Sequence, residues 1–326
     1  LYPVRTRGRL DHNQVPGLID LARSLGEIAL QEDAWRHQDG SDAQELIDTV
    51  RDSPGTVILS AEALSVMRDS GATSVISAFQ PAPVEVVVTL RDLARVLPSS
   101  WQQHVRNGNI EDFPTYLELR REERESREYL TTVGRAFWRA YLYGDLVRRW
   151  QSCASSVSVV TVPTSSADPA EVWRRFRAAG RLQDDIPAEP PEVSDDVANV
   201  SLTGAETYVL HGFNLAAREA GAGRREVRQV HRRLLKGGWS DRGERGPRLG
   251  LPEAMHEQVR AWADEDRADL AGVDVDLYGS LDDLNVTTVS AGSSPGPEAV
   301  AEAAGAALDI LRRGSTAPLD VGDDED

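Results

Sequence analysis

Two residues that suit phosphate binding stand close together after an apolar run. Arg91 directly follows VEVVVTL (84–90), and Ser99 comes eight residues later. The planar guanidinium of arginine donates paired hydrogen bonds to phosphate oxygens, and a serine hydroxyl adds one more donor. Open α/β sheets bind their ligands at the carboxyl ends of the strands. The spacing is therefore compatible with an anion site, and equally with an arginine paired to a local carboxylate and serines that cap a helix.

Three side chains could accept a proton in a transfer reaction. Glu62 follows the β-branched run Thr56–Ser60, where it also fits the first turn of a helix, because the helix dipole favours a carboxylate there. His104 lies one turn beyond Ser100, and His12 lies in RLDHNQ. Each histidine also fits an ordinary surface or core position. Glu62, His104 and His12 are the candidate catalytic bases.

The elements that would position these residues alternate between strands and helices. Three β-branched runs, at Thr56–Ser60, Val84–Leu90 and Ser155–Pro163, are apolar on both faces, as in the strands of a covered parallel sheet. Helical material separates one run from the next, as βα units require. The sequence therefore predicts an α/β fold with a mostly parallel sheet.

The segment after Arg91 is predicted to form two short helices. Asp92 can cap the first, LARVL, and Pro98 is expected to end it because proline lacks an amide proton. Ser99 and Ser100 would then precede a second helix. That arrangement would place their hydroxyls near a helix N-terminus, which favours anions.

The carboxyl-terminal part is predicted to be mostly helical. Apolar periodicity and start signals indicate helices at 41–52, 203–220, 224–235, 252–270 and 297–313, after a first helix within 14–30. The chain ends in the acidic stretch DVGDDED, which is typical of disorder. We expect an α/β domain over 1–286, followed by a helix and acidic tail over 287–326.

Composition limits the classes of partner. The net charge of −17 over 326 residues argues against binding to duplex nucleic acid, which needs a cationic face. A local arginine cluster can still hold a phosphate. No apolar run approaches the length of a membrane span, and the one cysteine, Cys153, excludes an internal disulfide and fits a cytoplasmic location. The six histidines lack metal-ligand spacing, so no metal is expected.

The chain resembles a known family in several stretches. A strand that ends in arginine, with serine eight residues later, is similar to the motif by which sulfotransferases hold the 3′-phosphate of PAPS, the activated sulfate donor. LYP and LDH near the start, VILSAEAL, VVVTLRDLARVLPSSWQQHV, VSVVTVP, NVSLTGAE and YGSLDDL are similar to stretches of sulfotransferase-like proteins of high-GC bacteria, the actinobacteria. The resemblance covers most of residues 1–286.

The resemblance implies a fold, a donor and a reaction. The fold would be the three-layer, P-loop NTPase-like sulfotransferase fold, with helices on both faces of the sheet and a helical carboxyl-terminal part. Arg91 and Ser99 would bind the 3′-phosphate of PAPS, and Lys236, in a late glycine-containing basic segment, is a further candidate for donor binding. A hydroxyl or amine of a small-molecule, glycan or lipid acceptor would attack sulfur directly, with a glutamate or histidine as base and without a metal.

One element of the family has no counterpart in residues 1–326. The family's loop of the form K-T-G-T-T holds the 5′-phosphosulfate, whereas the only lysine here is Lys236. Two alternatives stay open. The sequence begins after that loop, which the missing initial methionine favours, or the chain is a non-catalytic sulfotransferase-like binding protein. A P-loop nucleotide kinase is a weaker alternative, because neither a Walker lysine nor a clear acidic magnesium ligand is present.

Overall fold

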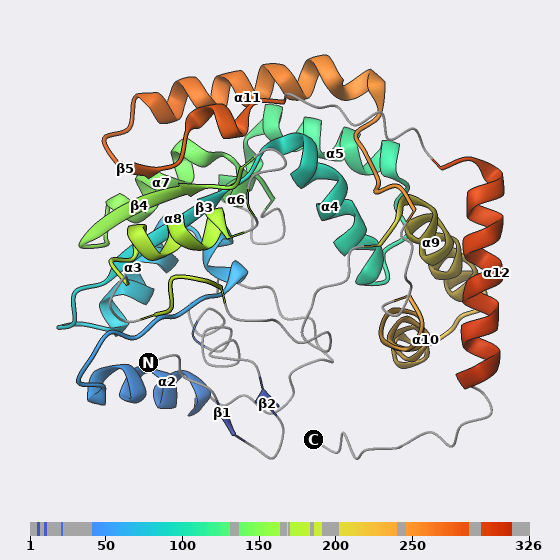
Figure 1. Ribbon diagram of the computed structural model, residues 1–326, viewed down its shortest axis with the longest axis horizontal. Coiled ribbons are helices and arrows are strands. Elements are labelled where there is room, and N and C mark those ends of the chain that lie inside the picture. Colours follow the sequence, from blue (N-terminus) through green and yellow to red (C-terminus); the bar gives the residue numbers. More distant parts are fainter. Residues whose placement is uncertain are drawn as a thin grey trace.

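Figure 1 shows a computed structural model of the chain. The structure describes residues 5–6, 10–11, 21, 41–130, 137–163, 168, 170–182, 186–190, 202–239, 246–286 and 295–314. These residues form a mixed α/β architecture that is mostly helical and contains a small parallel sheet. The predicted α/β class is therefore confirmed at this coarse level.

The parallel sheet has the strand order β3-β4-β5, with β3 at Glu85–Leu90, β4 at Ser156–Thr161 and β5 at Asp276–Tyr278. Every residue of β3 pairs with one of β4, from Glu85 opposite Ser156 to Leu90 opposite Thr161. The central strand β4 is almost wholly buried, whereas β3 is only partly so. The predicted burial on both faces thus holds for β4, while β3 lies at an edge of the described sheet. A separate two-residue ribbon pairs β1 (Arg5–Thr6) with β2 (Leu10–Asp11).

The prediction of a strand at Thr56–Ser60 is wrong. This segment lies outside regular secondary structure and joins no ladder with β3, β4 or β5 among the described residues. β-branched side chains favour an extended backbone, but only a ladder partner makes a strand. The third strand of the sheet is instead β5, whose three residues are too few to show a pattern.

The helices of the carboxyl-terminal half occur as predicted. α9 begins after Thr203, whose hydroxyl accepts a hydrogen bond from the Glu206 amide at 3.2 Å, while the Glu206 carboxylate accepts one from the Thr203 amide at 2.8 Å. Such a capping box satisfies two amides that the first turn leaves without partners. The described α-helices are α2 (Ser41–Asp52), α3 (Asp69–Ala78), α4 (Leu93–Arg106), α5 (Phe113–Ser126), α6 (Phe137–Tyr141), α7 (Tyr143–Gln151), α8 (Glu171–Ala179), α9 (Gly204–Glu219), α10 (Arg224–Gly237), α11 (His256–Ala271) and α12 (Pro297–Gly314). The described 3₁₀ helices are η1 (Glu62–Val66), η2 (Glu128–Leu130), η3 (Glu253–Met255) and η4 (Leu281–Leu284).

Helices surround the sheet and continue beyond it. α8 crosses in front of the sheet, α7 lies behind it, and α9, α10 and α12 pack together at the far end (Figure 1). One hydrophobic core lies between the sheet and helices α3 and α7, and a second joins α4 and α5 to the carboxyl-terminal helices. Trp101, Trp138 and Trp239 are fully buried in the second core. Burial of large aromatic surfaces of this kind stabilises the fold by about 3–5 kcal/mol per side chain.

The helix after Arg91 differs from the prediction. α4 is continuous from Leu93 to Arg106 and contains Pro98, so it does not end there. Proline removes one helical hydrogen bond, but Leu97, Pro98 and Trp101 are buried, and this packing offsets the loss. Ser99 therefore lies inside a helix and not at its N-terminus.

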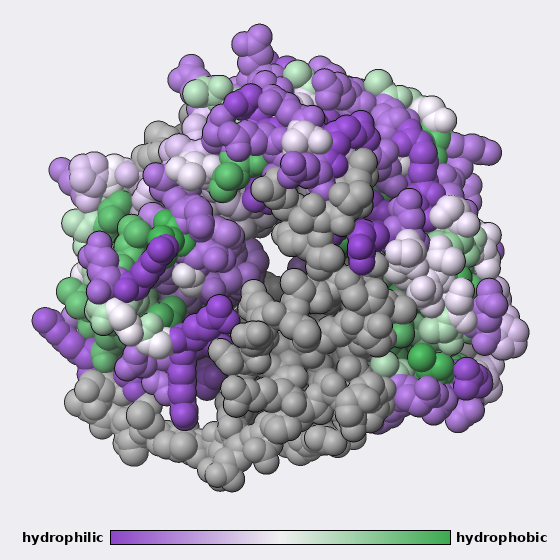
Figure 2. Space-filling view, turned by 180° about the vertical axis from the view of Figure 1, so that it is seen from behind, coloured by the Kyte–Doolittle hydropathy of each residue, from purple (hydrophilic) through white to green (hydrophobic). Residues whose placement is uncertain are grey.

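On the face seen from behind, most of the described residues are hydrophilic, and hydrophobic residues form small separate areas, most of them toward the two sides (Figure 2). Among the described residues we find no helix with the length and apolarity that a bilayer crossing requires.

Candidate functional site

A cleft of about 1500 Å³ brings together three of the residues singled out in the sequence. Glu62, Arg91 and Ser99 all line it. The walls come from 55–62, from 84–89 along β3, and from one side of α4. Because Arg91 follows the last residue of β3, the cleft reaches the carboxyl end of this parallel strand, the place where α/β sheets bind ligands.

Arg91 is a half-buried cation for which the described residues supply no partner. Its guanidinium forms no hydrogen bond or ion pair with the described part of the chain, and its Nε is buried. Burial lowers the pKa of Arg91, and the like charges of Arg95 and, to a smaller extent, Arg248 lower it further, while the carboxylate of Asp92 acts in the opposite direction. A charge that is partly removed from water and repelled by two neighbours favours a bound anion.

The backbone around Arg91 is held on both sides. The buried hydroxyl of Tyr143, on α7, donates a hydrogen bond to the Arg91 carbonyl. Asp92 caps α4 by accepting from the Arg95 amide at 3.0 Å, and its carboxylate also pairs with the Arg95 side chain. Arg95 in turn donates to the carbonyl of Val162, just after β4, at 3.3 Å. The strand end is thereby fixed, while the Arg91 side chain stays available.

The two serines of α4 have different surroundings. The Ser100 hydroxyl forms a 2.6 Å hydrogen bond with the hydroxyl of Tyr116, whereas Ser99 is exposed toward the cleft. No hydrogen bond joins Ser99 to Arg91. The structure brings Arg91 and Ser99 to one cleft, where a single ligand could reach both.

Glu62 shares the cleft with the hydroxyl group of Tyr141. The carboxylate begins η1 and is exposed in the cleft, which Tyr141 of α6 also lines. Burial raises the pKa of Tyr141, and the negative charge of Glu62 raises it further, while Arg91 acts in the opposite direction. The sequence did not single out Tyr141, because it stands among apolar residues, Phe137, Trp138 and Leu146, that are typical of a core.

Of the other predicted site residues, His104 is described in full and does not line this cleft. His104 Nε2 lies 2.7 Å from the Glu111 carboxylate, and its ring packs against Tyr116. Lys236 lies in the last turn of α10 and not in a loop, and its side chain is outside the described part. His12 also lies outside the described residues. Within the described ranges, no group of three or more His, Cys, Asp or Glu side chains could hold a metal ion.

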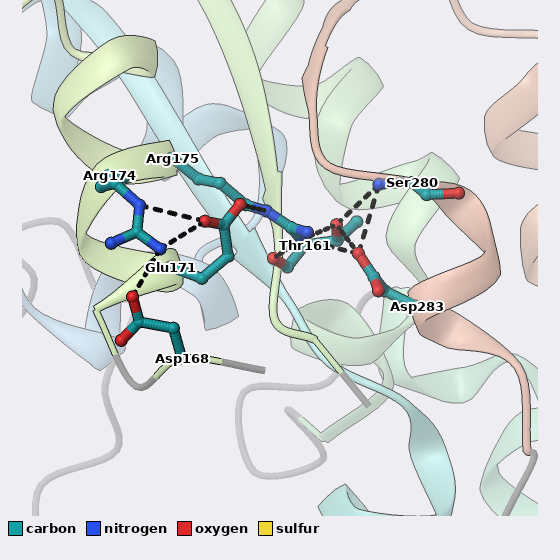
Figure 3. A network of polar contacts seen from close by, with 7 residues as sticks. All are labelled: Thr161, Asp168, Glu171, Arg174, Arg175, Ser280 and Asp283. Atoms are coloured by element: carbon teal, nitrogen blue, oxygen red, sulfur yellow. Dashed lines mark hydrogen bonds and ion pairs between the residues drawn. The ribbon is translucent and has the colours of Figure 1, made fainter. Parts of the chain in front are cut away.

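The neighbouring strand end is closed by a polar network (Figure 3). At the end of β4, the Thr161 hydroxyl donates to the Asp283 carboxylate at 2.6 Å. Arg175, from α8, donates to the same carboxylate at 2.6 Å and to the Thr161 carbonyl at 2.8 Å. The Ser280 amide donates to the Thr161 hydroxyl at 3.1 Å. These contacts tie α8, β4 and η4 together.

The outer part of the same network consists of ion pairs on α8. Glu171 pairs with Arg175 at 2.9 Å and with Arg174 at 2.9 Å, and Arg174 also reaches Asp168 at 2.8 Å. Each of the two guanidiniums thus has at least two polar partners. The strand end of β4 therefore carries a structural arginine cluster.

In comparisons with protein-family models, with curated proteins and with solved structures, nothing matches this chain.

Proposed function

We propose that the chain is a PAPS-dependent sulfotransferase with the P-loop NTPase-like sulfotransferase fold, and that the cleft at the end of β3 binds the donor. The observation that carries the proposal is the half-buried guanidinium of Arg91, which pairs with none of the described residues, at the carboxyl end of a parallel strand. A charged group removed from water is stabilised only when an opposite charge and hydrogen bonds replace its hydration. The 3′-phosphate of PAPS supplies both.

In this proposal each residue of the cleft has one role. Arg91 and Ser99 donate hydrogen bonds to the 3′-phosphate, as the family motif implies. Glu62, the carboxylate of the cleft that forms no ion pair among the described residues, accepts the proton of the acceptor hydroxyl or amine. The acceptor oxygen or nitrogen forms a bond to sulfur as the bond between sulfur and the bridging phosphate oxygen breaks. Sulfated acceptor and 3′-phosphoadenosine 5′-phosphate leave.

Binding of 3′-phosphoadenosine 5′-phosphate, measured by calorimetry, tests the donor site. Arg91→Ala should weaken binding tenfold to a hundredfold, because hydrogen bonds to charged groups are worth about 1.5–3 kcal/mol. Ser99→Ala should weaken it about threefold. Arg181→Ala is the matched control, since this arginine also lines the cleft but pairs with Glu85 at 3.1 Å. Equal binding by wild type and Arg91→Ala would contradict the proposal.

Turnover separates the enzyme from the second candidate, a binding protein that holds the nucleotide without transferring sulfate. The second candidate is kept because the sequence contains Lys236 as its only lysine and no K-T-G-T-T loop. With PAPS and a panel of sugar, lipid and small-molecule alcohols, the enzyme releases 3′-phosphoadenosine 5′-phosphate. Glu62→Gln should lower this release at least tenfold and leave nucleotide binding within twofold. Nucleotide binding without release assigns the binding protein.

A further inference from the structure

The cleft contains a second arginine at the opposite end of α4. Arg106 is the last residue of this helix and lines the same cleft as Arg91 and Ser99. Arg106 lies seven positions after Ser99, which is about two helical turns. At a rise of 1.5 Å per residue the two positions share one face of the helix and lie roughly 10 Å apart.

Arg106 resembles Arg91 in its surroundings. Its side chain is half-buried and forms no hydrogen bond or ion pair with the part of the chain that the structure describes. Burial lowers the pKa of its guanidinium. An arginine in the last turn of a helix is favoured by the helix dipole. The dipole explains why a cation stands at this position, but it does not explain why the guanidinium is partly buried while no described carboxylate pairs with it.

The end of α4 that carries Arg106 is held in place by buried polar groups. His231, on α10, forms a 2.9 Å hydrogen bond with the Arg106 carbonyl through Nδ1 and a 2.8 Å bond with Asn214 through Nε2. The Asn214 amide donates to the carbonyls of Val105, at 2.8 Å, and Asn109, at 2.9 Å. As at Arg91, the backbone is fixed and the guanidinium is left available.

The charges of the cleft favour an anion at both ends. Four of the described lining residues are arginines, and two of them, Arg51 and Arg181, form ion pairs with exposed carboxylates. Arg91 and Arg106 form no ion pair with the described residues, and Glu62 is the one described lining carboxylate that also forms none. The described lining of the cleft therefore carries more positive than negative charge, although the net charge of the chain is −17. Such local charge selects anionic ligands.

We propose that Arg106 forms a second anion subsite, which binds a carboxylate, phosphate or sulfate carried by the acceptor, two helical turns from Ser99 along α4. The assignment of the bound molecule as the acceptor rests on the proposed function, whereas the subsite itself does not. The acceptor class is then an acidic alcohol or amine, such as an acidic sugar. Its anionic group is held at Arg106, and the donor phosphate is held at Arg91 and Ser99.

Calorimetry with four related sugars tests the subsite, in the presence and absence of saturating 3′-phosphoadenosine 5′-phosphate. Glucuronate, glucose 6-phosphate and glucose 6-sulfate carry the three anionic groups, and neutral glucose is the reference. At least one acid should bind wild-type protein tenfold or more tightly than glucose. The acid whose affinity exceeds that of glucose by the largest factor identifies the anionic group that the subsite prefers.

Variants of two lining arginines decide whether Arg106 is responsible. Arg106→Gln should reduce the advantage of the acid to twofold or less and leave nucleotide affinity within twofold, whereas Arg106→Lys should keep part of the advantage. Arg51→Gln is the matched control and should change neither, because Arg51 pairs with Asp48 at 3.3 Å. The proposal is overturned if no acid exceeds glucose or if Arg106→Gln binds acids as wild type does. Failure of the proposed function alone would show as Arg106-dependent acid binding without nucleotide binding.

Discussion

Two neighbouring parallel strands, β3 and β4, have arginines with contrasting surroundings at their carboxyl ends. At the end of β4, Arg175 has several partners and belongs to a closed network with Thr161 and Asp283. At the end of β3, Arg91 is half-buried and has none among the described residues. Both ends hold an arginine, but only one arginine uses its hydrogen-bonding groups within the protein. The comparison teaches that a closed arginine cluster serves the fold, whereas an open one is available for recognition.

The largest expected effect tests how tightly the network at β4 is closed. Gly279 has a φ of +124°, which only glycine adopts readily, and an added Cβ would meet the Thr161 hydroxyl and the Arg175 guanidinium. Gly279→Ala should therefore lower the free energy of unfolding by about 3 kcal/mol or more, measured by urea denaturation. Gly212→Ala, in α9 with open space around it, is the control and should raise stability by about 0.5–1 kcal/mol. A small effect of Gly279→Ala would mean that the network yields easily.

A loss of stability of intermediate size is expected when Arg175 and Arg91 are compared directly. Arg175→Ala should lower the free energy of unfolding by about 2 kcal/mol, because it leaves the Asp283 carboxylate and the Thr161 carbonyl short of donors. Arg91→Ala should change it by less than about 0.5 kcal/mol, because no internal bond is lost. Urea denaturation of both variants measures the difference. Similar losses for the two variants would break the distinction between a closed and an open strand end.

The smallest expected effect is a pH dependence of the closed network. Burial acts to raise the pKa of Asp283, but hydrogen bonds from Thr161, Arg175 and the Ser280 amide together outweigh it and hold the pKa below its usual 3.8. The unfolded chain then binds the proton more readily, so the network loses stability as the pH falls below about 4.

Stability curves between pH 6 and pH 3 measure this loss. Wild-type protein should lose more stability over this range than Asp283→Asn, by up to about 1 kcal/mol. Parallel curves for the two proteins would show that Asp283 titrates as an ordinary carboxyl group.

The sequence predicted the elements whose signals are local. The runs at β3 and β4 are β-branched and long enough to be recognised, and α9 to α12 have clear periodicity and start signals. The segment Thr56–Ser60 has the composition of a strand, but whether it forms one depends on a partner far away in the sequence. Pro98 was expected to end a helix that the burial of its neighbours maintains.

The candidate site was predicted in part, for a similar reason. Arg91, Ser99 and Glu62 line one cleft, and their roles stay predictions. Only Arg91 lies there for the predicted reason, because it follows the parallel strand β3, whereas Glu62 follows an irregular segment and Ser99 lies inside α4. His104 is one helical turn from Ser100, but its ring contacts Glu111 and Tyr116 and does not line the cleft. Arg106 gave no signal in an arginine-rich sequence, because whether an arginine has a partner is visible only in three dimensions.

The hydrogen bond from Tyr143 to the Arg91 carbonyl has a consequence for affinity. It anchors the main chain only, so an anion that binds the guanidinium must order the remaining rotamers of the side chain, at a cost of up to about 2 kcal/mol. An anion at this strand end would therefore be held less tightly than one bound by a guanidinium that internal contacts already hold in place, as they hold Arg175.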